Sequence, residues 1–97
     1  MIRVTCDPRR YAMTVEGHSG SAKKGEDLIC SASTILALTL AELVETVCAE
    51  KQIEIRDGYA EIRGDKKAAQ YLDFARTGFR MLAEMEPEHV VCADRYD

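Results

Sequence analysis

The stretch from residue 28 to about residue 49 constrains the fold more than any other part of the chain. Its pattern predicts one long helix that is apolar on most sides and keeps only a narrow polar stripe. The large apolar side chains in it are Leu28, Ile29, Ile35, Leu36, Leu38, Leu40, Leu43, Val44 and Val47. Such a helix has to be covered on most of its surface, by a sheet or by another subunit.

A first hairpin is predicted before this helix. Ile2, Val4 and Cys6 alternate with polar residues, and residues 7–10 contain turn-forming Asp and Pro. The returning strand carries its apolar side chains on one face; these are Tyr11, Met13 and Val15. This strand ends at Gly17-His18.

A second hairpin follows the helix. Ile53 and Ile55 alternate with charged residues, and Asp57-Gly58 fits a two-residue type I′ turn before residues 59–63 return. Asp65 can then cap a second helix that runs from residue 66 to about residue 86. The apolar face of that helix consists of Ala68, Tyr71, Leu72, Ala75, Phe79 and Leu82.

The order of these elements predicts the fold class. A short β-prone segment, residues 89–92, follows the second helix and completes the order ββα-ββα-β. This order is typical of an α+β fold, in which a small sheet has two helices packed on it. At 97 residues the chain forms a single domain, residues 1–97.

Charge argues against direct contact with nucleic acid. The formal net charge is −4, and the basic residues form three separate pairs, Arg9–Arg10, Lys23–Lys24 and Lys66–Lys67. A broad basic surface needs clustered cations. No apolar run approaches the length of roughly 18–20 residues that a membrane helix needs, so no membrane contact is expected.

The N-terminus lacks the apolar run of a secretory signal, so we expect a cytoplasmic protein with reduced thiols. The cysteines are Cys6, Cys30, Cys48 and Cys92, without a Cys-x-x-Cys pair. We expect no disulfide framework, and Cys6, Cys48 and Cys92 are interpreted as inert core residues.

His18 and Cys30 are the candidate catalytic pair. If Asp27 caps the long helix, Cys30 falls in its first turn, where unpaired N–H groups and the helix dipole favour a thiolate. The same N–H groups could stabilise an oxyanion. Residues 19–26, with Gly20 and Gly25, form a predicted substrate-gating loop that can bring His18 over the helix terminus as a general base.

The sequence around this pair resembles that of the ribosomal-processing cysteine protease (Prp) family. Gly17-His18-Ser19, a glycine-bearing loop and residues 25–32 match that family's Gly-His-Ala, glycine-rich loop and Gly-x-Asp-Ile-Val-Cys-Ala-Ala at the head of a long helix. His18 and Cys30 also stand at the family's separation, twelve positions apart. Departures from the family pattern are Ser19, Ile29, Ser31 and Ser33.

The resemblance implies a function and a set of residues. It implies a homodimeric endopeptidase, without a cofactor or metal, that removes a short N-terminal extension from a large-subunit ribosomal protein. By position it makes His18 and Cys30 the catalytic dyad, with Gly17, Asp27 and Thr34 in support. Asp27 either orients His18 or caps the helix; capping is favoured because a carboxylate beside Cys30 would oppose a thiolate.

Other interpretations remain beside this one. A non-catalytic ribosome-associated binding module would have no need for the pair at this separation. A thiol redox or acyl-transfer protein would also use Cys30, but the resolving cysteine expected nearby for redox work is missing. His89-x-x-Cys92 has a spacing that a metal could use, but a zinc site needs more ligands clustered near it.

Overall fold

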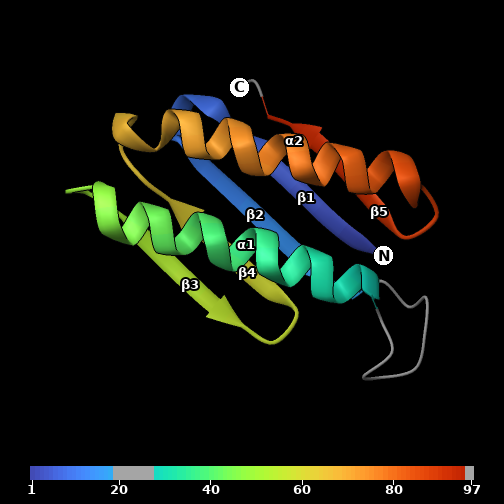
Figure 1. Ribbon diagram of the computed structural model, residues 1–97. Coiled ribbons are helices and arrows are strands. Elements are labelled where there is room, and N and C mark those ends of the chain that lie inside the picture. The colour runs from blue at the N-terminus through green and yellow to red at the C-terminus, as the bar shows by residue number, and fades with distance from the viewer. Residues whose placement is uncertain (19–27, 96–97) are drawn as a thin grey trace.

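The protein forms one five-stranded sheet with two helices on one of its faces (Figure 1). The computed structural model describes residues 1–18 and 28–95. The sheet order is β3-β4-β2-β1-β5, and the strands are β1 (Ile2–Asp7), β2 (Ala12–Gly17), β3 (Gln52–Arg56), β4 (Tyr59–Arg63) and β5 (Val90–Asp94). The helices are α1 (Leu28–Val47), α2 (Ala69–Met85) and two short 3-10 turns, η1 (Pro8–Arg10) and η2 (Lys66–Ala68). The predicted α+β order ββα-ββα-β is confirmed.

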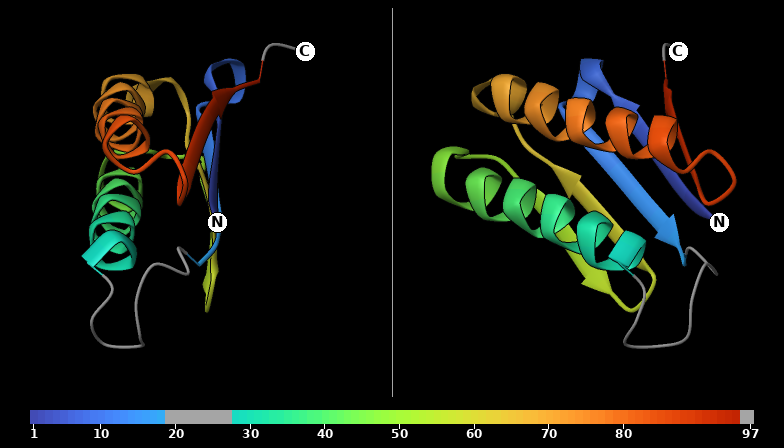
Figure 2. Two further views of the ribbon diagram at one scale, coloured as in Figure 1. Left: turned by 90° about the vertical axis from the view of Figure 1, so that its right-hand side faces the viewer. Right: turned by 45° about the vertical axis from the view of Figure 1, so that its right-hand side comes forward.

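The core lies between the sheet and the helix layer, which stand as two layers in Figure 2. Period-two alternation produces the sheet side of it, because every second side chain of a strand points to the same face. Ile2, Val4 and Cys6 of β1 are buried, as are Met13 and Val15 of β2. Each large side chain that is fully buried in this layer contributes roughly 1.5–3 kcal/mol.

The predicted last strand lies at the sheet edge. β5 pairs with β1 in parallel, with Ile2 opposite Val90. The other three neighbouring pairs are antiparallel. Residues from both ends of the chain therefore share one edge of the sheet, with α2 packed over β5.

α1 is covered less than its sequence suggests. It buries one face, made of Ser33, Ala37, Leu40, Ala41 and Val44. Leu28 is 82 % exposed and Ile35 is 63 % exposed. Within the described residues the sheet and α2 therefore leave an apolar part of α1 open to solvent.

The expectation that no segment reaches the composition of a membrane helix is wrong for α1. By length and apolar composition alone this helix could cross a membrane. The core helix of a globular domain passes the same test, and α1 packs its buried face into the core. Moving α1 into a bilayer would remove that face from the core. The free energy lost there would have to be offset by burying the exposed apolar residues of α1 in lipid.

Two local predictions are wrong in detail. Tyr11 does not belong to the second strand; it ends η1 in the left-handed region, with φ of 53°. The Asp57-Gly58 turn does join β3 to β4, with Arg56 opposite Tyr59. Among the described residues, however, Tyr11 is the one non-glycine residue with positive φ, so Asp57 lacks the conformation that a type I′ turn requires.

Asp65 joins the end of α1 to the start of the second helical segment. One carboxylate oxygen accepts hydrogen bonds from the backbone N–H groups of Ala49 (3.0 Å) and Glu50 (3.2 Å). The other oxygen accepts from the N–H of Lys67 at 2.9 Å, which confirms the predicted cap. These N–H groups, that of Lys67 first, lower the pKa of Asp65 from 3.8 to about 2.

We predict that Asp65→Asn lowers the melting temperature at neutral pH, because an amide has one acceptor oxygen where the carboxylate has two. A lowered pKa means that the stabilisation is present above pH 3.8 and is lost as the pH falls to about 2. The difference in melting temperature between wild type and variant should therefore shrink over that window. The matched control is Asp73→Asn on exposed α2 surface; an equal loss in both variants would contradict the role given to Asp65.

Candidate active site

His18 and Cys30 line the same cleft. The cleft has a volume of about 850 Å³ and lies between the first half of α1, the end of β2 and the β3–β4 turn. In Figure 1 the start of α1 lies over this end of the sheet. The fold thus places both residues along one cleft, although they come from separate elements; the dyad itself stays a prediction.

Gly17 places His18 at the rim of the cleft. It has φ of 99°, and a Cβ atom at this position would overlap the carbonyl oxygen of Met1. Its N–H donates to the carbonyl of Gly58 at 2.8 Å, which ties the end of β2 to the β3–β4 turn. The backbone nitrogen of Met1 donates to the carbonyl of His18. The backbone of the predicted base is therefore held from two sides, while its side chain is exposed.

Gly58 lies directly against the His18 imidazole, a contact that sequence reasoning missed. A Cβ atom built on Gly58 would stand 2.8 Å from Nε2 of His18, closer than real Cβ contacts. Gly58 also has φ of 71°, which side chains rarely adopt. The sequence signals the turn, but nothing in it signals that the missing side chain makes room for the ring.

Cys30 is the third residue of α1 and is half-buried. This position lies in the first turn of the helix, at the positive end of its dipole. Thr34 lies one turn further on, is exposed, and lines the same cleft. The predicted residues Asp27, Gly20 and Gly25 lie outside the described residues.

The cleft has an apolar wall and a polar one. Ile35 and Leu38 of α1 and Ile55 of β3 line it with partly exposed side chains. At the turn, the guanidinium of Arg56 lies 4.1 Å from the centre of the Tyr59 ring. The Tyr59 hydroxyl donates to Glu61 at 2.7 Å, and this bond raises the pKa of Tyr59.

The remaining cysteines differ from one another. Cys6 and Cys48 are buried, as predicted for core residues. Cys92 is only half-buried, and its hydrogen bond with Cys6 lowers its pKa to about 7 while it raises that of Cys6. Cys92 packs against the core from its half-buried position, and whether it is inert stays a prediction. Over residues 1–18 and 28–95, no three His, Cys, Asp or Glu side chains gather as metal ligands.

Solved structures share the fold. A crystal structure of the essential ribosomal processing protease Prp from S. aureus with a covalently linked product peptide superposes with a TM-score of 0.85 at 16 % identity, over 98 % of this chain and 100 % of that one. The same protease with a substrate peptide gives 0.79 at 15 % identity, with 98 % and 100 % covered. SMU.848 from Streptococcus mutans gives 0.77 at 25 % identity, over 100 % and 96 %.

Comparison with curated protein sequences gives no significant match. The family model for cysteine protease Prp, however, matches residues 1–91, nearly the whole chain. That match includes both β-hairpins, α1 with Cys30, and the strand that ends before His18. It agrees with the resemblance drawn from the residues around His18 and Cys30, and with the shared fold. The chain belongs to the cysteine protease Prp family.

Proposed function

We propose that this cysteine protease removes a short N-terminal extension from a large-subunit ribosomal protein, with Cys30 as nucleophile and His18 as general base. The observation that carries the proposal is that both side chains line one cleft, from separate elements of a family-matched fold. The S. aureus relative is described as a ribosomal processing protease and holds peptides. Support for the substrate comes from that relative.

The reaction needs one proton carrier and one site for negative charge. His18 takes the thiol proton of Cys30, and the thiolate attacks the carbonyl carbon of the scissile bond. First-turn N–H groups of α1 stabilise the oxyanion. The C–N bond breaks as the His18 imidazolium gives its proton to the leaving amine, and His18 then activates a water that hydrolyses the thioester.

The shape of the cleft suits an extended peptide. One side of the cleft offers Ile35, Leu38 and Ile55, which are partly exposed and apolar. Burying a substrate's apolar side chain there contributes roughly 25 cal/mol per Å² removed from water. We therefore assign this wall to large apolar side chains near the scissile bond. Specificity then comes from a few positions rather than from the bulk sequence.

The supporting residues have distinct proposed roles. Gly17 fixes the approach of His18, because the strand has to leave the sheet through a positive φ. Thr34 presents its hydroxyl to the cleft one turn from Cys30. Asp27 caps α1, and the loop with Gly20 and Gly25 gates the substrate; both assignments stay predictions.

A cytoplasmic homodimer is also proposed. The described chain leaves large apolar side chains exposed on both helices, with Leu28 on α1 and Phe74, Met81 and Met85 on α2. A second copy is the partner that the family resemblance implies for such a surface. Measurement of the protein's mass in solution tests whether two copies associate.

We predict that wild-type protein shortens the extended ribosomal protein at one site near its N-terminus, as mass analysis of the product will show. Cys30→Ala should remove the activity, and His18→Ala should lower turnover by on the order of 10²–10⁴, the usual effect of losing a positioned acid–base group. His89→Ala is the matched control, because His89 does not line the cleft. It should cleave at the wild-type rate.

Casein serves as the specificity control in this experiment. Comparable cleavage of casein would contradict the assigned substrate while leaving a cysteine protease. An uncleaved ribosomal protein that nevertheless binds wild type and Cys30→Ala equally would favour the alternative, a ribosome-associated binding module.

We predict that Gly58→Ala lowers turnover, because the new methyl group would occupy space 2.8 Å from Nε2 of His18 and displace the ring. Gly58 acts here as a positioning residue. Its effect should therefore vanish in the His18→Ala background, where no imidazole remains to be displaced. A double-mutant cycle on turnover measures this coupling.

Gly78→Ala is the control for a crowded glycine away from the cleft, since its Cβ would meet Leu36 between the helices. Gly58→Ala should also lower the melting temperature because of its positive φ, whereas Gly78→Ala should keep turnover. Equal losses of turnover from Gly58→Ala with and without His18 would show that it acts only through backbone strain.

A further inference from the structure

A second cavity lies at the opposite end of the sheet from the candidate active site, and it is strongly basic. Its volume is about 730 Å³. The cationic side chains that line it are Arg9, Arg10, Lys51, Arg63, Lys66 and Lys67, against two acidic ones, Glu50 and Asp65. The whole chain has a net charge of −4. Positive charge is therefore concentrated at this end of the molecule.

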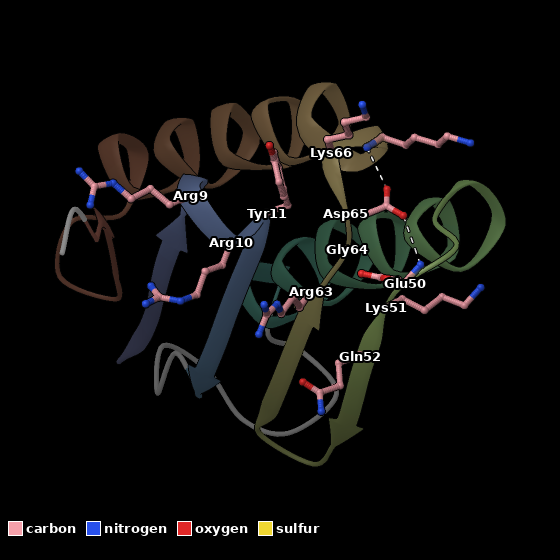
Figure 3. A pocket seen from close by; sticks show the side chains of 11 residues that line it. Arg9, Arg10, Tyr11, Glu50, Lys51, Gln52, Arg63, Gly64, Asp65 and Lys66 are labelled. Atoms are coloured by element: carbon pink, nitrogen blue, oxygen red, sulfur yellow. Dashed lines mark hydrogen bonds between the residues drawn. The ribbon is translucent and has the colours of Figure 1, made fainter.

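The fold gathers cations that the sequence scatters. Arg9 and Arg10 come from η1, Arg63 from the end of β4, and Lys66 from η2 (Figure 3). In the sheet, Arg63 stands opposite Ala12 of β2. Two of the three basic pairs that appeared separate in the sequence thus meet at one site, which corrects the interpretation of the basic residues as scattered.

Four of these cations have no anionic partner in the described part of the chain. Arg10 is paired with Asp7, and Lys51 lies 3.5 Å from Glu45. No carboxylate of residues 1–18 or 28–95 lies within 4.0 Å of the remaining cations, which are Arg9, Arg63, Lys66 and Lys67. Asp65 forms no ion pair with them, because its oxygens accept from backbone N–H groups, and with Glu50 it leaves the six cations in excess. The site therefore carries positive charge that an external anion can neutralise.

An aromatic ring stands among these cations. Tyr11 packs against the core from a half-buried position and also lines the cavity, and Figure 3 shows it between the η1 arginines and Lys66. Its left-handed backbone is held by a hydrogen bond from the N–H of Gly64 to its carbonyl at 3.0 Å. A positive groove with an aromatic platform is the arrangement with which proteins bind single-stranded nucleic acid.

We propose that this basic cavity binds a single-stranded RNA segment through its phosphate backbone, with one base stacked on Tyr11. All six cations are exposed, which suits a polyanion held by salt-dependent contacts more than one enclosed phosphate group. They also lie across the ends of three adjacent strands, about 10 Å, so several phosphates are needed to reach them. The choice of RNA as the polyanion rests on the proposed function, because a ribosomal protein substrate is an RNA-binding protein.

The site leaves the cleavage reaction untouched. It shares no lining residue with the cleft that holds His18 and Cys30. Bound RNA would therefore hold the enzyme near its substrate without covering the catalytic pair. Binding can accordingly be measured on Cys30→Ala protein, so that failure of RNA binding and failure of proteolysis are separate results.

The test is fluorescence anisotropy of a labelled oligouridylate of about 12 nucleotides, near the upper part of the range for single-strand binding sites. At about 50 mM salt we expect a dissociation constant below about 10⁻⁴ M, with a slope of log affinity against log salt near −0.7 for each phosphate contacted. Two to four contacts give a slope between about −1 and −3. No binding, or binding without salt dependence, would overturn the proposal.

The variants separate this site from general charge. Arg63→Gln with Lys66→Gln should weaken binding roughly 10- to 100-fold and make the salt slope shallower. Arg3→Gln with Arg80→Gln removes equal charge from exposed positions outside the cavity and should leave affinity within about twofold. Equal losses in the two double variants would overturn the assignment of the site.

Two further arms test the ligand class and the ring. Poly-glutamate and an RNA duplex of the same length should compete more weakly than the single strand, and equal competition by either would contradict the proposal.

Tyr11→Asn removes the ring while keeping a residue that tolerates left-handed backbone. It should weaken binding about 5- to 100-fold, the usual worth of one stacked base. Unchanged affinity would refute the stacking role.

Discussion

The hydrogen bond from the Gly17 N–H to the Gly58 carbonyl, 2.8 Å long, is the contact on which the candidate active site depends. It extends the pairing of β2 with β4 by one step, beyond Glu16 and Tyr59. This hydrogen bond ties the end of β2, just before His18, to the turn that carries Gly58. The imidazole then rests on a residue without a side chain, opposite the start of α1.

The first hairpin was predictable because apolar and polar residues alternate in it, and Ile2, Val4 and Met13 are buried where that pattern places them. β5 lies at the β-prone segment after the second helix, but its parallel pairing with β1 was not predicted. The pair His18 and Cys30 was proposed from residue types at a family spacing. Both residues line one cleft, and their role as a dyad stays a prediction.

Other features depend on contacts between distant segments, which local patterns do not encode. Tyr11 continues an alternating pattern, but it ends η1 and its carbonyl accepts a hydrogen bond from the Gly64 N–H. It therefore lies outside the strand. Cys92 looks like a core residue, but its pKa is set by Cys6 on the neighbouring strand. The basic cavity arises in the same way, because segments around Arg9 and Lys66 meet only after folding.

The structure places the two candidate sites at opposite ends of one sheet. One end carries the candidate active-site cleft with its apolar wall, and the other carries cations that pair with no carboxylate among the described residues. The two sites lie apart because opposite ends of β3 and β4 line them. A substrate and a polyanion can therefore be bound at the same time, without competition for one surface.

The most direct test of the central claim is the rate of Cys30 alkylation across pH, with Cys92→Ser in the background to remove the other half-buried thiol. If His18 assists ionisation of Cys30, the rate near pH 6–7 should fall by roughly tenfold or more in His18→Ala, while His89→Ala should match wild type. A rate profile that His18→Ala leaves unchanged would contradict the pairing of His18 with Cys30.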